Sequence, residues 1–320
     1  MIAPLLALRD ALARMREQTE ARLAHLSPQA RLWRRRLWRW ARTLTAFGIT
    51  LLVLGAAYFI FIASQGAVDA DLEAPLAAAP QGGSRAVAEA ARLLALAPDD
   101  LGSGALFLPD RHSRRVTLFQ EGAVEAVGGF VEVLARRRAA DRDLDQAADL
   151  MAAPSVDLPE TARRHAEARE ALRRYNARTG AAGGRAVDRT RETLAALARA
   201  AAAFSAAHEQ AVRDAAVRGR FGPADPGAEA AFFQARGHAY AWARLLQAYA
   251  ADLPDAESAP LRSALEEAVR PLTVAADFEP RVLFNAPAGS VAPNHLERMA
   301  TYLAGAVAAA KRLDQAASPG

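Results

Sequence analysis

A run of twenty uncharged residues, Leu44 to Ala63, sets the limits within which the rest of this chain can fold. In a helix that rises about 1.5 Å per residue, the run is about 30 Å long, which is the thickness of the hydrocarbon core of a bilayer. Eleven of its residues are Leu, Ile, Val or Phe. Together, such side chains favour insertion by roughly 3–7 kcal/mol at the centre of a membrane helix. The run therefore predicts a transmembrane helix at residues 44–63.

The run could instead be a buried core helix or a cleaved signal peptide. A helix of this length that is buried in a protein core usually carries a polar stripe, which this run lacks. A cleaved signal peptide usually has about 7–15 apolar residues behind a short basic start. Here 43 residues precede the run. We therefore expect an uncleaved signal anchor.

The distribution of arginine predicts the orientation of this anchor. Residues 1–43 contain ten Arg and three acidic residues, whereas acidic residues follow the run at Asp69, Asp71 and Glu73. Short flanking segments rich in Lys and Arg stay in the cytoplasm. The expected localisation is a bacterial inner membrane that the chain crosses once, with the N-terminus in the cytoplasm. Residues 64–320 would then lie in the periplasm of a Gram-negative bacterium.

The arginines before the run are expected to contact anionic lipid at Arg34, Arg35, Arg36 and Arg39. Tryptophans typical of a membrane interface lie among them, at positions 33, 38 and 40. Residues 44–320 carry 30 basic and 33 acidic residues, so the outer part of the chain is slightly acidic. Since no nucleic-acid-binding motif occurs, we predict no nucleic-acid partner.

Residues 1–43 are expected to form a short amphipathic helix and a basic linker in the cytoplasm. Leu5, Leu8, Leu12 and Met15 lie at helical spacing, and Pro28 ends this pattern. Two roles are open for the helix at residues 3–26. It would lie on the membrane surface, or it would dock a cytoplasmic partner.

After the run, we predict a linker at residues 64–83, rich in Ala, Pro and Gly, and a helical domain at residues 84–320. Apolar residues of the domain recur at helical spacing, and no stretch alternates like a strand over more than four or five residues. The predicted fold class is therefore all-α, with about seven helices after the transmembrane helix. The chain has no cysteine, which excludes disulfides, thiolate catalysis and cysteine-bound zinc.

Glycine and proline between the apolar patterns predict where the helices begin and end. Ser84 is the expected N-cap of the first helix. The glycines of Gly122–Gly129 lie inside a helical pattern and indicate close helix packing rather than a phosphate-binding loop. The predicted helices cover residues 84–97, 116–138, 141–151, 159–179, 185–218, 227–251 and 259–274, and a last helix follows residue 293.

No catalytic or metal-binding motif occurs in the outer domain. His208 and Glu209 begin like the zinc motif HExxH, but the sequence HEQAV lacks the second histidine. We therefore expect His208 to lie in the core or at its edge. The other outer histidines do not pair with a histidine at i+3 or i+4; they are His112, His165, His238 and His295. The sequence predicts no catalytic residue, no metal and no cofactor.

Two irregular segments, residues 98–113 and 275–294, are the best candidates for a binding site. Long loops that mix apolar and polar residues usually pack on something or bind something. The candidate binding residues within these segments are Asp110, Asn294 and His295. Asn294, followed by Glu297, also fits a helix N-cap, which is a structural alternative for this residue.

Three sequence motifs resemble a known family. Behind the N-terminal run follow, in this order, LFLPDRHSRRVTLFQEGAVEAV at residues 106–127, FFQARGHAYAWARLLQAY at residues 232–249 and APNHLERMATYLAGA at residues 292–306. Together they resemble the bacterial family known as domain of unknown function 2333, over most of residues 64–320. The chain departs from the family pattern at residues 111–115, where Asn, Pro and aromatic residues are common. The resemblance implies an envelope protein anchored in the inner membrane and implies no active site.

These features predict a non-enzymatic envelope protein whose helical domain binds a partner protein. The alternative is an envelope enzyme or small-ligand binder with a site formed by residues 98–113 and 275–294. A third hypothesis is a homo-oligomeric structural element. Gly48 and Gly55 lie seven residues apart, however, and form no GxxxG motif that would support a packed dimer of the span.

Overall fold

The computed structural model describes residues 28–65, 71–95, 110–138, 141–153, 158–181, 190–218, 222–223, 226–253, 259–280, 282–286 and 293–318. Within these ranges, side chains are described except at residues 28–32, 34–36, 39, 56–65, 110–113, 158 and 222–223. The described chain forms nine α-helices and one pair of two-residue strands, so the predicted all-α class is confirmed. The helix predicted at residues 3–26 lies outside the described residues.

The elements, in chain order, are α2 (Pro28–Gln65), α3 (Arg85–Ala95), α4 (Asp110–Arg137), α5 (Arg142–Ala152), α6 (Leu158–Ala181), α7 (Arg191–Arg218), β1 (Gly222–Pro223), α8 (Pro226–Asp252), α9 (Ala259–Asp277), β2 (Phe284–Asn285) and α10 (His295–Ala317). The fold class was predicted with about seven helices after the apolar run, and eight are described, α3 to α10, one for each of the eight segments predicted to be helical.

Residues 1–61 and residues 62–320 form two compact units, and α2 lies largely in the first. The large apolar side chains described in α2 are all exposed, from 54% at Leu51 to 74% at Leu52. Among the residues that the structure describes, no helix is both long and apolar enough to cross a membrane. The described side chains of α2 end at Gly55, whereas the predicted span continues to Ala63.

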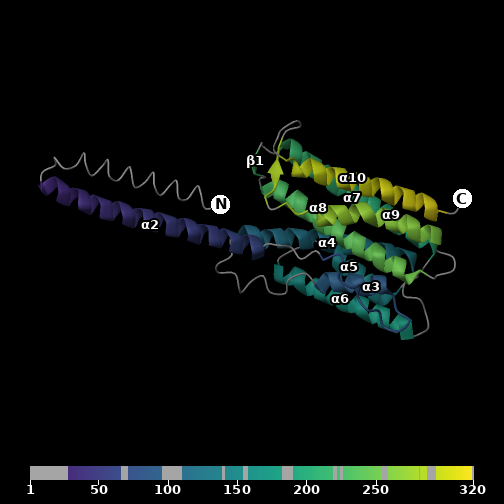
Figure 1. Cartoon of the computed structure of the whole chain (residues 1–320). Helices are drawn as coiled ribbons and strands as arrows, with labels where there is room; N and C mark the ends of the chain where they lie inside the picture. The colour runs from purple at the N-terminus through teal and green to yellow at the C-terminus, as the bar shows by residue number, and fades with distance from the viewer. Residues whose placement is uncertain are drawn as a thin grey trace. The chain divides into compact units, whose positions relative to one another are not determined.

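The second unit is built around α8, which contacts α3, α4, α7 and α9 (Figure 1). The sequence pattern predicts one buried face for this helix, but the helix is buried on all sides. Phe232, Tyr240, Trp242 and Tyr249 are each at most 2% exposed. A helix that is buried all round belongs to the centre of a core. The polar residues of α8 must therefore find their partners inside the protein.

Helices α4 and α8 cross in close contact through two glycines. A Cβ atom at Gly122 would lie 1.9 Å from the carbonyl oxygen of Gln234, and one at Gly237 would lie 1.8 Å from that of Phe119. At Gly129, a Cβ atom would lie 2.6 Å from the ring of Phe204 on α7. The predicted role of Gly122 and Gly129 in close helix packing is confirmed.

Two helices extend into segments predicted to be irregular. α4 begins at Asp110 and not at residue 116, so this end of the segment 98–113 is helical. An acidic residue at the first position of a helix is favourable because it faces the positive end of the helix dipole. α9 continues through Pro271 to Asp277, beyond its predicted end at residue 274. Beyond α9, β2 pairs with β1 in antiparallel orientation.

Candidate functional site

Asn294, one of the predicted binding residues, caps α10. Its Oδ1 accepts a hydrogen bond from the Glu297 N–H at 3.0 Å, as an N-cap does. Its Nδ2 donates to the carbonyl oxygen of Ala286 at 2.7 Å. The predicted N-cap is confirmed, and both ends of the side-chain amide serve to hold β2 and its neighbours against α10.

His295 fixes the same segment from the next position. Its Nδ1 accepts a hydrogen bond from the Phe284 N–H at 2.9 Å, which requires a neutral ring with its proton on Nε2. Burial lowers the pKa of His295, and the nearby Arg298 lowers it further. The third predicted residue, Asp110, is the first residue of α4, and its side chain lies outside the described set. A binding role for these three residues stays a prediction.

Two histidine rings meet where α4, α7 and α8 pack together. The ring centroids of His208 and His238 lie 4.5 Å apart, and His208 Nε2 lies 3.1 Å from Glu125 Oε2. On the other side, His238 Nε2 lies 3.4 Å from Ser205 Oγ. His208 is 8% exposed and His238 is fully buried. The expectation that His208 is a core or edge residue is therefore confirmed.

His238 is held in its neutral form. Burial lowers the pKa of His238 far below its usual value, and His208 lowers it further. Among the described residues, Nδ1 of His238 and Nε1 of Trp242 have no hydrogen-bond partner. A proton on His238 would thus place a charge in the core without a compensating group, so its protonation opposes folding.

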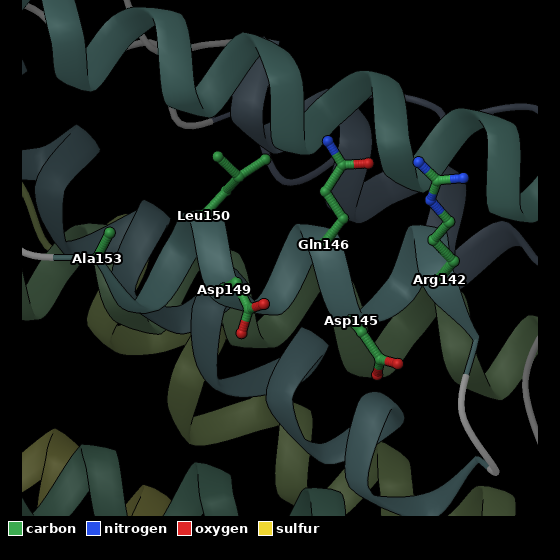
Figure 2. Close-up of a pocket in the computed structure, with 6 residues that line it drawn as sticks. All are labelled: Arg142, Asp145, Gln146, Asp149, Leu150 and Ala153. Carbon is green, nitrogen blue, oxygen red and sulfur yellow. The ribbon is translucent and has the colours of Figure 1, made fainter.

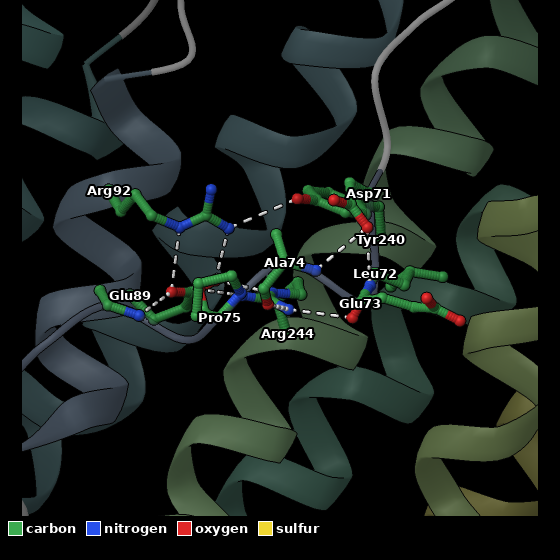
Figure 3. Close-up of polar contacts among 10 residues, drawn as sticks. Asp71, Leu72, Glu73, Ala74, Pro75, Glu89, Arg92, Tyr240 and Arg244 are labelled. Carbon is green, nitrogen blue, oxygen red and sulfur yellow. Dashed lines mark hydrogen bonds and ion pairs between the residues drawn. The ribbon is translucent and has the colours of Figure 1, made fainter.

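The most developed polar cluster is a buried ion pair between α3 and α8, which we name the clamp: Glu89 and Arg244 (Figure 3). Arg244 Nε donates to Glu89 Oε1 at 2.8 Å, and the two side chains are 1% and 0% exposed. Removing two such charges from water is costly unless further hydrogen bonds satisfy their remaining polar atoms. These further bonds come from a segment far from α8 in the sequence.

The remaining donors of Arg244 bind the non-helical segment before α3, residues 71–80, which we name the strap. Arg244 donates to the carbonyl oxygens of Leu72, Ala74 and Pro75 at 3.0, 2.7 and 3.1 Å (Figure 3). Several donors of one guanidinium are therefore used on three main-chain acceptors of the strap and on Glu89. Arg244 thus recognises the strap through its backbone.

Glu89 binds the strap as well. Its Oε2 accepts a hydrogen bond from the Ala77 N–H at 2.9 Å. Between these polar contacts, Leu72 and Leu76 pack against the hydrophobic core of the domain. The first two residues of the linker predicted at 64–83 belong to α2, and residues 71–83 are non-helical as expected. Residues 72–77 are, however, fixed to the domain.

Arg92 completes the clamp from α3. Its Nη2 and Nε lie 2.6 and 3.0 Å from Glu89, and its Nη2 lies 3.4 Å from the Tyr240 hydroxyl. Burial raises the pKa of Glu89, but hydrogen bonds from Arg92, the Ala77 N–H and Arg244 outweigh it and leave the pKa below its usual value. The hydrogen bond to Glu89 raises the pKa of Arg92. The carboxylate is therefore charged at neutral pH.

A second set of buried contacts holds the start of α3, just after the strap. Ser84 Oγ accepts from the Val87 N–H at 3.2 Å, which confirms the predicted N-cap. Asp252, the last residue of α8, accepts from the N–H groups of Arg85 and Ala86 at 2.9 and 3.1 Å. A carboxylate in this position satisfies amides that lack partners within the helix. α8 thus holds the strap through Arg244 and the start of α3 through Asp252.

A shallow hollow of about 510 Å³ lies along α5 (Figure 2). Figure 2 shows Arg142, Gln146 and Leu150 along one side of the helix and Asp145 and Asp149 along another. The described residues that line it all belong to α5 and its C-terminal end. Among the described residues, the hollow therefore brings no groups of different elements together.

The sequence-based prediction missed the clamp. Its available signal was the spacing of Arg236, Tyr240 and Arg244, which repeats every four residues within an otherwise apolar helix. Such spacing places polar groups on one side of a helix. It does not reveal that the partners are Glu89, which precedes Arg244 by 155 residues, and main-chain carbonyl groups.

Among the described residues, no group of three or more His, Cys, Asp or Glu side chains could hold a metal ion. Comparison with models of known protein families, with curated proteins and with solved structures gives no match. The resemblance to the domain of unknown function 2333 therefore stays a prediction.

Proposed function

We propose that this protein is a single-pass membrane protein of the bacterial envelope whose helical domain binds a partner protein. In this proposal, residues 44–63 span the inner membrane, residues 1–43 lie in the cytoplasm, and residues 84–320 form a periplasmic scaffold. The proposed protein holds a partner protein at the membrane and does not convert a substrate.

The exposure of α2 is the observation that carries the proposal. Leu51, Leu52, Val53 and Leu54 are exposed by 54%, 74%, 57% and 60%. Because successive residues of an α-helix point about 100° apart, four consecutive exposed side chains cover its whole circumference. A partner helix would cover one stripe of this surface. A bilayer would cover all of it, which favours lipid as the environment of α2.

The basic end of α2 suits a membrane interface. Trp33, Trp38 and Trp40 are 64–69% exposed, and indole rings prefer the level of the lipid headgroups. Arg34, Arg35, Arg36 and Arg39 lie in the same stretch of sequence and would attract anionic lipid. The excess of Arg on this side also supports a cytoplasmic N-terminus.

The hydrogen bonds of two predicted binding residues, Asn294 and His295, favour a scaffold protein over a small-ligand binder. Asn294 uses its amide to cap α10 and to hold Ala286, and His295 uses Nδ1 to hold Phe284. A ligand that engaged these atoms would have to replace hydrogen bonds that hold β2. A partner protein could instead bind exposed faces of the outer helices without disturbing these contacts.

Fusion of alkaline phosphatase after Gly320 tests the topology. The reporter needs disulfides, which form outside the cytoplasm, so we expect an active fusion. A fusion after Thr43, before the apolar run, is the matched control and should be inactive. An inactive Gly320 fusion made at normal levels would contradict the proposed orientation.

Photo-cross-linking in living cells tests the scaffold role. Lysine-directed reagents are unsuitable because the chain contains a single lysine, Lys311. A photoreactive amino acid should instead replace exposed residues on different helices, such as Glu132, Glu170 and Arg199. We expect one partner, captured from neighbouring positions in stoichiometric amounts. If no position captured a specific protein under several growth conditions, the scaffold role would be wrong.

A further inference from the structure

We propose that the clamp and the strap form a tether that fixes how far the helical domain can lie from the end of the membrane anchor. The biological meaning of this tether rests on the proposed anchor at residues 44–63. The tether itself rests only on the contacts of residues 72–77 with α3 and α8.

The first argument is the mode of recognition. Arg244 binds three carbonyl oxygens and Glu89 binds one N–H group of the strap, and both side chains are buried. Buried ionic groups are tolerated when such bonds complete their coordination. The strap therefore completes the clamp, and the clamp in turn prevents this part of the chain from moving as a free linker.

The second argument is the exposure pattern of the strap. From Asp71 to Leu76, exposed and half-buried residues alternate. The alternation places one side of the segment against the protein and the other in solvent. Residues 72–74 form a bend, in which Asp71 Oδ1 accepts hydrogen bonds from the Glu73 and Ala74 N–H groups at 2.9 and 3.0 Å. The strap lies outside the helices and takes no part in their main-chain hydrogen bonds, so loss of its contacts with the clamp and the core would free it. The strap can therefore be released while the helices behind it stay folded.

The third argument is chain length. Seven residue steps separate the end of α2 at Gln65 from the first clamped residue, Leu72, and nineteen separate it from Ser84, the cap of α3. At about 3.3–3.6 Å per residue, the docked strap limits the connection to about 25 Å, whereas a released strap would allow about 65 Å. Docking of the strap thus shortens the maximum length of the connection between α2 and the domain by more than half.

The docked strap that is observed and a released strap would differ in the length of the free connection. With the strap docked, seven residue steps join Gln65 to the clamp; with the strap released, twelve more residues would lengthen the connection by about 40 Å. The residues on which α3 depends, Asp252 and Asn176, are separate from the clamp, so release need not unfold α3. The tether thereby sets the distance at which a partner of the domain can be held.

Distances between paired spin labels on the full-length protein test this inference. Because the chain has no cysteine, introduced cysteines are unique labelling sites. Glu73→Cys paired with Lys311→Cys reports docking of the strap, and Ser64→Cys paired with Lys311→Cys reports reach. The perturbing variant combines Leu72→Ser, Leu76→Ser and Ala77→Pro. It removes two apolar contacts and the N–H that binds Glu89, and it leaves the clamp residues unchanged.

We expect a narrow distance distribution for the first pair in the otherwise unaltered protein and in the control Ala78→Pro. The triple variant should broaden it, with the helical circular dichroism signal and the unfolding temperature of the domain little changed. For the second pair, the root-mean-square length of the connecting chain should rise about 1.6-fold, because it scales with the square root of the number of residues.

Two results would overturn the tether. One is a distribution that is already broad in the unaltered protein, and the other is a triple variant that keeps the narrow distribution. Measurement in detergent as well as in nanodiscs separates this inference from the proposed function. A protein that failed to insert into membranes but kept a docked strap in detergent would refute the anchor and leave the tether standing.

Discussion

Alanine substitutions at Gly122 and Gly128 should change the stability of the domain in opposite directions, although both residues lie within α4. In an exposed or loosely packed helix, replacing glycine by alanine stabilises by about 0.5–1 kcal/mol, because glycine loses more backbone entropy on folding. At Gly128, the new Cβ would lie 3.7 Å from the Met151 side chain, which is an ordinary contact. Gly128→Ala should therefore gain about 0.5–1 kcal/mol.

At Gly122, the same change meets the backbone of α8. The new Cβ would lie 1.9 Å from the carbonyl oxygen of Gln234, so the two helices would have to separate by roughly 1.5 Å to restore an ordinary contact. Forcing extra volume into a packed core costs about 1–3 kcal/mol, and here the obstacle is backbone that cannot change rotamer. After the gain in helix propensity of about 0.5–1 kcal/mol is subtracted, Gly122→Ala should lose about 0.5–2 kcal/mol. Gly237→Ala should behave in the same way, since it faces the Phe119 carbonyl at 1.8 Å.

Urea unfolding of the full-length protein in detergent, followed by circular dichroism, measures the difference. The two α4 variants should differ by about 1–3 kcal/mol in the free energy of unfolding, or by several degrees in melting temperature for a domain of this size. If Gly122→Ala were as stable as Gly128→Ala, the close crossing of α4 and α8 would be wrong, and with it the placement of α8 at the centre of the domain.

Three further predictions concern the polar clusters. Glu89→Gln should lower the free energy of unfolding, measured by urea titration, by about 3–5 kcal/mol, because it leaves Arg244 buried without its carboxylate partner. The control is Glu192, whose side chain is 64% exposed: Glu192→Gln should cost less than about 1 kcal/mol in the same titration. The pKa of Glu89 is lowered in the fold, so its contribution is present above the pKa of an unfolded glutamate and disappears as the pH falls through the folded value. The pKa of His238 is also lowered, so below about pH 6.5 the unfolded chain binds a proton that the folded chain excludes, and stability should fall by up to about 1.4 kcal/mol per pH unit. His238→Phe should reduce the slope of stability against pH by about one proton, and an unchanged slope would contradict the assignment. Asn294→Ala should cost about 1 kcal/mol through loss of the α10 cap, whereas Asn294→Asp should cost less, because Asp also caps helices; thermal unfolding of both variants checks this.

Features that depend on neighbouring residues were predictable from the sequence. In the N-caps at Ser84 and Asn294, a side-chain oxygen binds the main-chain N–H three residues later. An N-cap can therefore be predicted from four consecutive residues. Most of the breaks between helices coincide with Pro or Gly for the same local reason, although the break between α4 and α5 contains neither. The start of α4 was placed too late, because the apolar pattern becomes visible only at Val116, after a first turn of polar residues.

Features that depend on distant residues were not predictable. α8 was expected to bury one face because apolar residues recur along it at helical spacing: Phe232, Ala235, Ala239, Trp242, Leu246 and Tyr249. Three polar residues of α8 are buried as well, since each lies against groups from other helices. Arg236 donates to the Ala276 carbonyl, the His238 ring lies against that of His208, and Arg244 binds Glu89. Every residue has a main-chain carbonyl group, so these groups leave no pattern in the sequence. The sequence of the strap therefore does not reveal that Arg244 binds it.

Arg244 is difficult to replace for a reason that a simple buried ion pair does not share. An isolated buried pair can often be exchanged for well-packed apolar residues at little cost, because both charges disappear together. A double replacement of Glu89 and Arg244 by apolar residues would also leave the carbonyl groups of Leu72, Ala74 and Pro75 without their donors. Each carbonyl group left without a donor and without water would lower the free energy of unfolding by about 1–3 kcal/mol. The strap must then either stay docked with unpaired acceptors or leave the domain, and departure is the cheaper result because the freed carbonyl groups bind water. The pair is therefore better understood as a device that selects the docked strap than as a source of stability for the helices.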